Sequence, residues 1–168
     1  MSLKILETER LILARLTLAD AAFILELMNE PGFIEFVADR GLRTEADAAR
    51  YLAEKILPNY ERFGFGFYRV TLKESGIAIG ICGLVKRDVL DNPDIGFSIL
   101  DRYSRNGYAY EAAVAVMSYG RTVLGLTQIC GVTAPDNRVS QHLLKKLELK
   151  FQRKLHLPGY GTESLLFG

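Results

Sequence analysis

Residues 94–112 read DIGFSILDRYSRNGYAYEA, and this stretch carries the strongest indication of the fold. It begins with an apolar segment, Asp94 to Leu100, that is typical of a strand. It ends inside an alanine-rich helix that we expect from about Tyr108 to Val123. Gln128 to Thr133 predicts the next strand. A strand, a helix and another strand in this order predict two parallel neighbours joined by a right-handed crossover.

Further elements are predicted on either side of this unit. Phe67 to Leu72 and Ile77 to Val85 are apolar runs separated by a four-residue turn, and a second turn leads into the strand at residue 94. Turns this short join antiparallel neighbours. A short helix from Val139 to Leu147 and an extended segment beginning at Phe151 follow the crossover.

The N-terminal third predicts a strand followed by two amphipathic helices. Leu11 to Leu16 is the strand. Thr17 and Thr44 are each followed by an aspartate three residues later, a carboxylate form of the capping box that begins a helix. The first helix should stop before Pro31, and Pro58 should weaken or end the second.

Composition and pattern together predict one α/β domain over residues 1–168. Hydrophobic residues make up 49% of the chain, so burial can offset the entropy cost of ordering and a disordered protein is excluded. The elements predict a mixed, mostly antiparallel sheet with helices on both faces. No apolar run approaches the roughly 18 residues that cross a bilayer, and no secretory signal is seen. We therefore expect a cytoplasmic protein that does not bind membranes.

Charge is balanced overall but unevenly distributed. The chain has 21 Lys and Arg against 20 Asp and Glu, a net charge of +1, which excludes nucleic-acid binding by bulk positive charge. Residues 17–39 contain five carboxylates and no Lys or Arg, whereas residues 138–154 contain six cations and one carboxylate. These segments are either two solvated faces or the two sides of a site that meets a cation and a polyanion.

Cysteine and histidine offer no metal site. Cys82 and Cys130 each lie in an apolar run without a CxxC partner, which is typical of reduced core thiols, a catalytic thiol being the alternative. His142 and His156 have no Cys or second His at ligand spacing, so no metal is expected.

The junction from Ser104 to Ala112 is a candidate anion site. A loop that turns into a helix N-terminus points unpaired N–H groups at one place, and the helix dipole adds to the attraction. Gly107 and Ala109 are small enough for close backbone approach, and Arg105 could add a charge-assisted contact. Neither GxGxxG nor GxxxxGK[ST] is present, so dinucleotide and P-loop sites lack their residues.

The sequence resembles the GNAT superfamily of N-acetyltransferases, in particular its ribosomal-protein N-terminal acetyltransferase-like branch. The order and spacing of several segments carry the resemblance, rather than any single motif. These segments span nearly the whole chain: Leu6–Leu13, Leu18–Ala21, Ile95–Phe97, Gly107–Ala112, Asn137–Ser140 and Leu144–Leu147.

The resemblance implies a GNAT-like fold with a splayed strand pair and a site for acetyl-CoA. The family's pyrophosphate loop corresponds to residues 104–109, where Gly107 and Ala109 match and Ser104 stands where Arg or Gln is usual. In the family, the strand before this loop carries a bulge, and its exposed backbone pairs with the pantetheine arm. The implied cofactor contacts are Ser98, Ile99, Leu100, Ser104, Arg105, Asn106, Gly107, Tyr108, Ala109, Asn137 and Lys146.

The resemblance also implies catalytic roles. A backbone N–H near Ser98 or Ile99 would polarise the thioester carbonyl. Asp94 is the candidate general base, acting through water, although its turn-rich surroundings also suit a structural role. Ser140 is the candidate donor to the leaving thiolate and Asn137 the candidate for orienting cofactor or a bridging water. Alternatively, the two begin the following helix.

The implied activity is acetyl-CoA-dependent N-acetylation of a primary amine. A protein N-terminal α-amine comes first, because its pKa of about 7.7–8.0 leaves part of it neutral at pH 7. A small polyamine-type amine is the alternative, suited to the acidic segment. Ser104, and Val132 where some relatives have a glutamate, leave open a non-catalytic acyl-CoA-binding module. The oligomeric state, monomer or homodimer, stays open.

Overall fold

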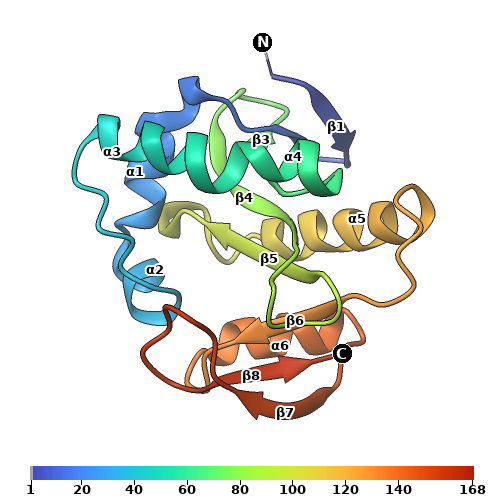
Figure 1. Ribbon diagram of the computed structural model, residues 1–168. Coiled ribbons are helices and arrows are strands. Elements are labelled where there is room, and N and C mark those ends of the chain that lie inside the picture. Colours follow the sequence, from blue (N-terminus) through green and yellow to red (C-terminus); the bar gives the residue numbers. More distant parts are fainter. Residues whose placement is uncertain (1) are drawn as a thin grey trace.

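Eight strands form one sheet in the order β1-β2-β3-β4-β5-β6-β8-β7 in this computed structural model, which describes residues 2–168 (Figure 1). Neighbours pair antiparallel except β5 and β6, which run parallel as the crossover pattern predicts. The strands are β1 (Lys4–Glu7), β2 (Leu11–Arg15), β3 (Phe67–Leu72), β4 (Ala78–Val85), β5 (Asp94–Ile99), β6 (Cys130–Thr133), β7 (Phe151–Leu155) and β8 (Ser164–Phe167).

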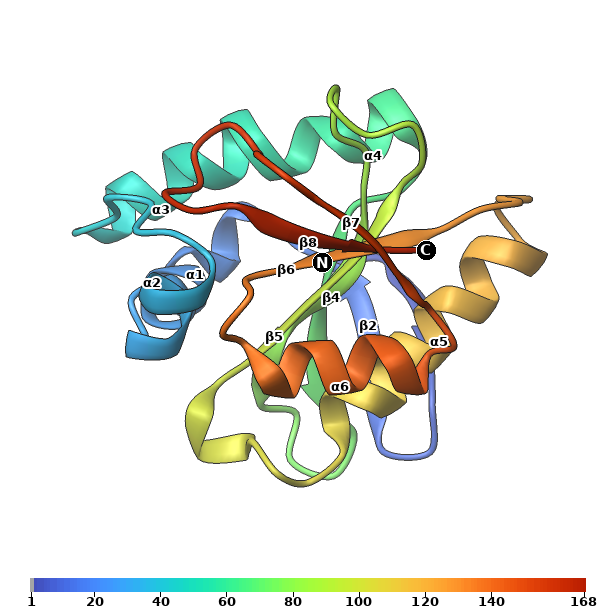
Figure 2. The ribbon, with the colours of Figure 1, turned by 90° about the horizontal axis from the view of Figure 1, so that it is seen from below.

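Helices cover both faces of the sheet, as predicted. Figure 2 shows α5 and α6 on one face, α3 and α4 on the other, and α1 and α2 together at one end of the sheet. The helices are α1 (Ala21–Met28), α2 (Pro31–Phe36), α3 (Glu45–Tyr51), α4 (Leu57–Phe63), α5 (Tyr108–Thr122) and α6 (Arg138–Lys146). Within residues 2–168, no helix is both long and apolar enough to cross a membrane.

The two predicted capping boxes are present. The Thr17 and Thr44 side chains each accept a hydrogen bond from the first turn of the following helix, and Asp20 and Asp47 each accept one from the cap N–H. The first helix begins as a 3-10 turn at Leu18–Asp20 and becomes α1.

Pro58 weakens the second helix without ending it. A π-helical segment, Leu52–Ile56, follows α3, and α4 then continues to Phe63. Pro58 lies in the first turn of α4 and has no N–H to donate. Directly before it, the Leu57 N–H donates to the Leu52 carbonyl five residues back, which is the hydrogen bond of a wider π turn. The helix therefore runs further than its proline suggests.

Three elements differ from the sequence prediction. Strand β1, which pairs with the predicted strand β2, was not predicted, and the segment Leu6–Leu13 that carries part of the resemblance spans the β1–β2 hairpin. The last extended segment is two antiparallel strands, β7 and β8. Helix α2 was not predicted: Pro31 lies in its first turn, where the missing N–H costs nothing, so the proline begins a helix as well as ending one.

β5 separates from β6 soon after they pair. Only Asp94 and Ile95 are in register with β6, opposite Cys130 and Gly131, whereas β5 stays paired with β4 along its whole length. The two strands diverge toward α2 in Figure 1. The splayed pair is therefore present. The expected bulge in β5 is absent, because its register with β4 has no shift, so the divergence comes from the short β5–β6 ladder.

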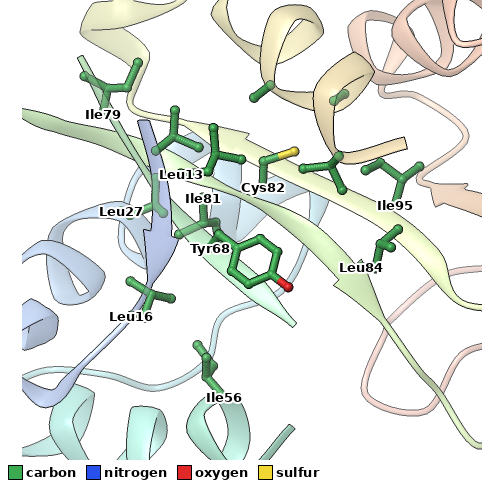
Figure 3. Close-up of a cluster of buried hydrophobic side chains, with 14 of the residues drawn as sticks. Leu13, Leu16, Leu27, Ile56, Tyr68, Ile79, Ile81, Cys82, Leu84 and Ile95 are labelled. Carbon is green, nitrogen blue, oxygen red and sulfur yellow. The ribbon is translucent and has the colours of Figure 1, made fainter. Parts of the chain in front are cut away.

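A continuous apolar core holds the sheet and helices together. The strand register places Leu13 of β2 and Tyr68 of β3 on one face of the sheet and Ile81 of β4 on the other, and Leu27 and Ile56 from the helical segments belong to the same core (Figure 3). All five side chains are buried.

Tyr60 ties α4 to the sheet with its hydroxyl. This oxygen accepts the Leu16 N–H at 3.0 Å and donates to the Phe67 carbonyl. Burial raises the pKa of Tyr60 to about 12, so the hydroxyl stays neutral and keeps both bonds at physiological pH.

Candidate active site

A cavity of about 520 Å³ opens where β5 and β6 separate. Its lining comes from α2, the end of β5, the loop before α5, the first turn of α5 and the first turns of α6. Segments far apart in the chain therefore meet at the open end of the parallel strand pair. A concave site at such a break in an α/β sheet is where small ligands commonly bind.

The backbone of β5 faces this cavity with unpaired groups. The Leu100 N–H donates to the Ile79 carbonyl of the β4 side at 2.8 Å, and the Pro93 carbonyl accepts the Cys130 N–H of β6 at 2.9 Å. Since hydrogen-bonding direction alternates along a strand, even-numbered residues of β5 bond to β4 and odd-numbered residues face β6. Phe97 and Ile99, beyond the β6 ladder, therefore present N–H and C=O groups to the gap.

The loop before α5 is braced by its own side chains. Ser104 Oγ donates to the Asp101 carbonyl at 2.6 Å, and Asn106 Nδ2 donates to the carbonyls of Tyr103 and Ser104. Arg105 and Gly107 adopt positive φ of 64° and 79°. Two left-handed residues so close together turn successive N–H groups toward one side, which is the geometry of an anion-binding nest.

The N-terminus of α5 adds further donors to this loop. Gly107 caps the helix without a side-chain hydrogen bond, so the first-turn N–H groups of Tyr108, Ala109 and Tyr110 lack intrahelical acceptors. All four residues line the cavity. The 15-residue helix brings its dipole to the same place, so the structure has the donors that a pyrophosphate group requires.

Arg10 places a guanidinium beside this helix start. The Arg10 Nε and the Arg10 backbone N–H both donate to the Glu111 carboxylate, the Nε at 2.7 Å. The Arg10 Cζ lies 4.4 Å from the centre of the Tyr108 ring. Thr8 also donates to Glu111. Partial burial acts to raise the pKa of Glu111, but these hydrogen bonds outweigh it and hold the pKa below its usual range. The β1–β2 hairpin is thereby fastened to the candidate anion site.

Most of the predicted cofactor contacts converge on the cavity. Eight of the eleven line it: Ser98, Ile99, Ser104, Arg105, Gly107, Tyr108, Ala109 and Asn137. The catalytic candidate Ser140 also lines it.

Three predicted contacts do not line the cavity. Leu100 is fully buried, with its N–H and C=O bonded to Ile79 and Tyr103, because it is the last residue paired with β4. Asn106 turns its amide into the loop. Lys146 lies at the margin, with its Nζ 4.0 Å from the centre of the ring of Tyr110, which does line the cavity.

A smaller cavity of about 140 Å³ adjoins the first. Its remaining lining includes Asp94, Arg87, Arg40 and Tyr160. The two cavities share seven lining residues, and their meeting point is therefore defined by Phe33, Phe36, Val37, Phe97, Ser98, Asn137 and Ser140.

Asp94 is buried in this second cavity. Its Oδ1 accepts a hydrogen bond from Arg87 Nε at 3.0 Å, and Arg87 also approaches the Tyr160 hydroxyl at 3.4 Å. Burial raises the pKa of Asp94 above its usual range, although Arg87 acts in the opposite direction. Asp94 lies about 14 Å along β5 from Ser98, four residues at roughly 3.4 Å each, so a proton would reach it through water.

Ser140 and Asn137 lie where the two cavities meet. Asn137 Oδ1 accepts the Ser140 N–H at 3.2 Å and caps α6, so the structural alternative for this pair is present. The cap uses the Asn137 carbonyl oxygen, which leaves its amide nitrogen and the Ser140 hydroxyl for a ligand. Capping and ligand contact are therefore compatible in this geometry.

The remaining sequence candidates stay outside the chemistry of this site. Burial raises the pKa of Cys82 well above its usual range and that of Cys130 to about 11, so both thiols stay protonated at neutral pH. Val132 lines the smaller cavity and offers no acid or base. Within residues 2–168, no three His, Cys, Asp or Glu side chains gather as metal ligands.

Sequence reasoning missed the aromatic wall that α2 provides. Phe33, Phe36 and Val37 line both cavities, and Arg40 follows them on the next loop. The available signal was Pro31, which favours the first turn of a helix, followed by apolar residues. Arg87 and Tyr160 had no local signal, because turns and loops far apart in the chain bring them together.

The acidic segment 17–39 is largely paired within the fold. Asp20 bonds Arg69 at 2.9 Å, Glu26 bonds Arg102 at 3.0 Å, and Asp39 bonds Arg43 at 2.9 Å. Glu30 accepts the Asp101 N–H at 2.6 Å. Most of its negative charge is therefore compensated by partners outside the segment.

Known proteins resemble this chain in sequence and in fold. A family model described as an acetyltransferase (GNAT) domain matches residues 10–150. The N-acetyltransferase YoaA of Bacillus subtilis is 31% identical over 152 residues, which cover 89% of this chain and 84% of that protein. An acetyltransferase structure from Agrobacterium tumefaciens aligns with a TM-score of 0.81 at 25% identity, over 99% of this chain and 94% of that one.

A further structural neighbour contains coenzyme A. RimL, a ribosomal L7/L12 alpha-N-protein acetyltransferase in complex with coenzyme A, aligns with a TM-score of 0.82 over 98% of this chain and 96% of that one. Its sequence identity is 12%, so this likeness shows the shared fold alone.

Proposed function

Because the chain belongs to the GNAT acetyltransferase family, whose members use acetyl-CoA, we propose that it transfers the acetyl group to a primary amine, first of all a protein N-terminal α-amine. The meeting of two cavities beside the open backbone of β5 carries this proposal. The larger cavity is the donor site and the smaller one is the acceptor site.

The residues present fit acetyl-CoA. The free N–H groups from Gly107 to Tyr110 would hold the pyrophosphate, with Arg105 and Lys146 adding positive charge. The outward-facing backbone of Phe97 and Ile99 would pair with the pantetheine arm as a neighbouring strand does. Acetyl-CoA supplies an acetyl group activated as a thioester.

The backbone N–H of Ile99 or Phe97 is suited to the charge that develops on the thioester oxygen. A fixed N–H donor aimed at such an oxygen is usually the largest electrostatic contribution to acyl transfer. Alternation along β5 favours these residues over Ser98, whose N–H is directed to β4. Phe97 therefore takes the place of Ser98 beside Ile99 in the predicted choice of donor.

Two side chains would transfer the protons of the reaction. The amine nitrogen forms a bond to the carbonyl carbon, the carbon–sulfur bond breaks, and one proton must leave the nitrogen while the sulfur gains one. Asp94 would receive the amine proton through water, and its raised pKa suits it to that task. Ser140, at the meeting point of the cavities, would donate to the departing sulfur.

The charges of the acceptor cavity favour an α-amine over a polyamine. Its charged lining consists of Arg40 and the Arg87–Asp94 pair, so the wall carries a net positive charge. Such a wall repels a polycation and accepts an α-amine that is partly neutral at pH 7. RimL, which shares the fold, is described as acting on a protein α-amine.

The proposal is tested by cofactor binding and by turnover. Acetyl-CoA at 100 times its Kd should stabilise the protein by about 2.7 kcal/mol, or roughly 5–10 °C in Tm. Release of free thiol should then follow with peptides that have a free α-amine, and much less with a polyamine. Cofactor binding without turnover on any amine would instead identify a non-catalytic acyl-CoA-binding module.

A further inference from the structure

Two buried polar groups of the acceptor cavity lack partners. Arg40 Nε and Thr133 Oγ1 are buried without a hydrogen bond, and both residues line the smaller cavity. Among residues 2–168, the third such atom is Arg15 Nε, on a side chain that has Glu61 at 3.6 Å. The Arg40 guanidinium has no carboxylate within 4.0 Å among residues 2–168.

The surroundings of Arg40 leave its charge uncompensated. Its neighbour Asp39 is engaged by Arg43 at 2.9 Å, and Asp94 is engaged by Arg87. The Cζ atoms of Arg40 and Arg87 lie 5.9 Å and 5.7 Å from the centre of the Tyr160 ring, so both guanidinium groups lie beside the same aromatic side chain and neither supplies a negative charge to the other. Arg40 as a whole is only partly buried, but its Nε is shielded from water and unpaired. A buried donor that loses its hydrogen bond with water without gaining another is costly.

The loop that carries Arg40 is held in place. Asp39 accepts the Gly41 N–H at 2.9 Å, and Asn29 Nδ2 donates to the Leu42 carbonyl at 3.0 Å. Arg43 Nη1 also donates to Asn29 Oδ1 at 3.1 Å. Arg40 is therefore presented by a braced loop, and the walls around it include six aromatic side chains: Phe33, Phe36, Tyr51, Phe67, Phe97 and Tyr160.

We propose that the acceptor carries a carboxylate close to its amine and that Arg40 binds this carboxylate. Guanidinium and carboxylate form two parallel hydrogen bonds, and an apolar cavity strengthens them because water screens them poorly. The inference rests on the proposed acetyl transfer and adds the acceptor's class to it. A free α-amino acid and a peptide that begins with an acidic residue both supply this chemistry.

Matched acceptors test the proposal. The pairs are a peptide beginning with Asp against the same peptide beginning with Asn, and alanine against alaninamide, with rates normalised to the neutral fraction of each amine. In at least one pair, kcat/KM should favour the carboxylate by about 10- to 100-fold, the range of a hydrogen bond to a charged group. The pair that responds identifies the source of the carboxylate.

Two variants separate Arg40 from general charge. Arg40→Gln should bring the carboxylate preference to about 1 while acetyl-CoA binding stays intact. Arg50→Gln removes an exposed arginine of α3 that pairs with Asp47 and does not line the cavity, so the preference should persist. Equal rates within both pairs, or a preference that survives Arg40→Gln, would overturn the proposal. So would weaker acetyl-CoA binding as the main effect of Arg40→Gln, since Arg40 would then belong to the donor site.

Product binding provides a readout that does not need turnover. For the acceptor pair that responds, the acetylated product with the carboxylate should raise the Tm of the wild-type protein more than the acetylated product with the amide does, and Arg40→Gln should remove the difference. Carboxylate-dependent binding without turnover on any amine would refute the acetyl transfer and leave the anion site standing. Turnover on amines without any carboxylate preference would refute the anion site and leave the acetyl transfer supported.

Discussion

Replacing Gly107 by alanine tests whether the left-handed loop before α5 forms the cofactor site. Gly107 has φ of 79°, and a Cβ there would meet Arg10 Nη2 at 3.5 Å, an ordinary contact. The cost of the substitution is therefore conformational, roughly 1–2 kcal/mol for an L-residue in this region. Gly64, which ends α4 with φ of 81° and open space around it, provides a matched control.

The two substitutions should divide this cost differently. At Gly64 the whole cost falls on folding, reduced by the lower entropy of the unfolded alanine chain, so the Tm should drop by about 2–4 °C per kcal/mol lost. The loop at Gly107 is exposed and its three side-chain hydrogen bonds are all local, so they do not prevent the alanine variant from relaxing the turn in the free protein. Binding must then restore the left-handed turn, and acetyl-CoA affinity should fall about 5- to 30-fold.

Calorimetric titration with acetyl-CoA and thermal unfolding of both variants measure the two effects. Gly64→Ala should lose stability and keep its Kd within about twofold. Gly107→Ala should lose less stability and bind acetyl-CoA more weakly. An unchanged Kd for Gly107→Ala, together with the same loss of Tm as Gly64→Ala, would show that the turn is a structural feature only and would refute its assignment to the cofactor.

Three further substitutions test other parts of the site. Ser140→Ala should lower kcat by roughly 100-fold with the acetyl-CoA Kd unchanged, measured by thiol release and calorimetry, and equal activity would remove Ser140 from the mechanism. Lys146→Gln should weaken acetyl-CoA binding about 2- to 5-fold at low salt and flatten its salt dependence, whereas identical titrations at two salt concentrations would place Lys146 outside the site. Glu111→Gln should lower the Tm at pH 7. The difference in Tm from the wild type should close below about pH 4, because the Glu111 carboxylate has a lower pKa in the folded protein than in the unfolded chain and its stabilisation is lost as it protonates. A Tm difference that stays constant from pH 7 to pH 3 would contradict this.

Elements with a local signal were predicted from the sequence. The capping boxes at Thr17 and Thr44 lie within one helical turn, and the apolar runs of β3, β4 and β5 alternate with turns. The parallel β5–α5–β6 unit follows from chain order alone. These features depend on neighbours in the sequence, and one chain contains all the information they need.

Features that depend on distant partners were not predicted. The role of α2 as a shared wall arises because β5 and β6 diverge beside it, and the sequence of α2 does not encode that divergence. Arg87 hydrogen-bonds to Asp94, 7 residues away in the sequence, and to Tyr160, 73 residues away. The candidate base was predicted as a side chain at a turn, and its burial and its partner appear only when these segments are packed together.

The two charged segments show how folding changes the meaning of a local charge count. The carboxylates of residues 17–39 bond to Arg69, Arg102 and Arg43, so they cannot also attract a cationic acceptor at full strength. The six cations of residues 138–154 have no carboxylate within 4.0 Å among residues 2–168, and one of them, Lys146, lies beside the donor cavity. On the proposed function, the cations of residues 138–154 therefore remain available to the phosphates of acetyl-CoA, whereas the paired carboxylates of residues 17–39 do not remain available to a polyamine. On the same proposal, the unpaired Arg40 gives the acceptor cavity the opposite sign from the one expected of residues 17–39, so that a carboxylate, rather than a second ammonium group, would be compensated there.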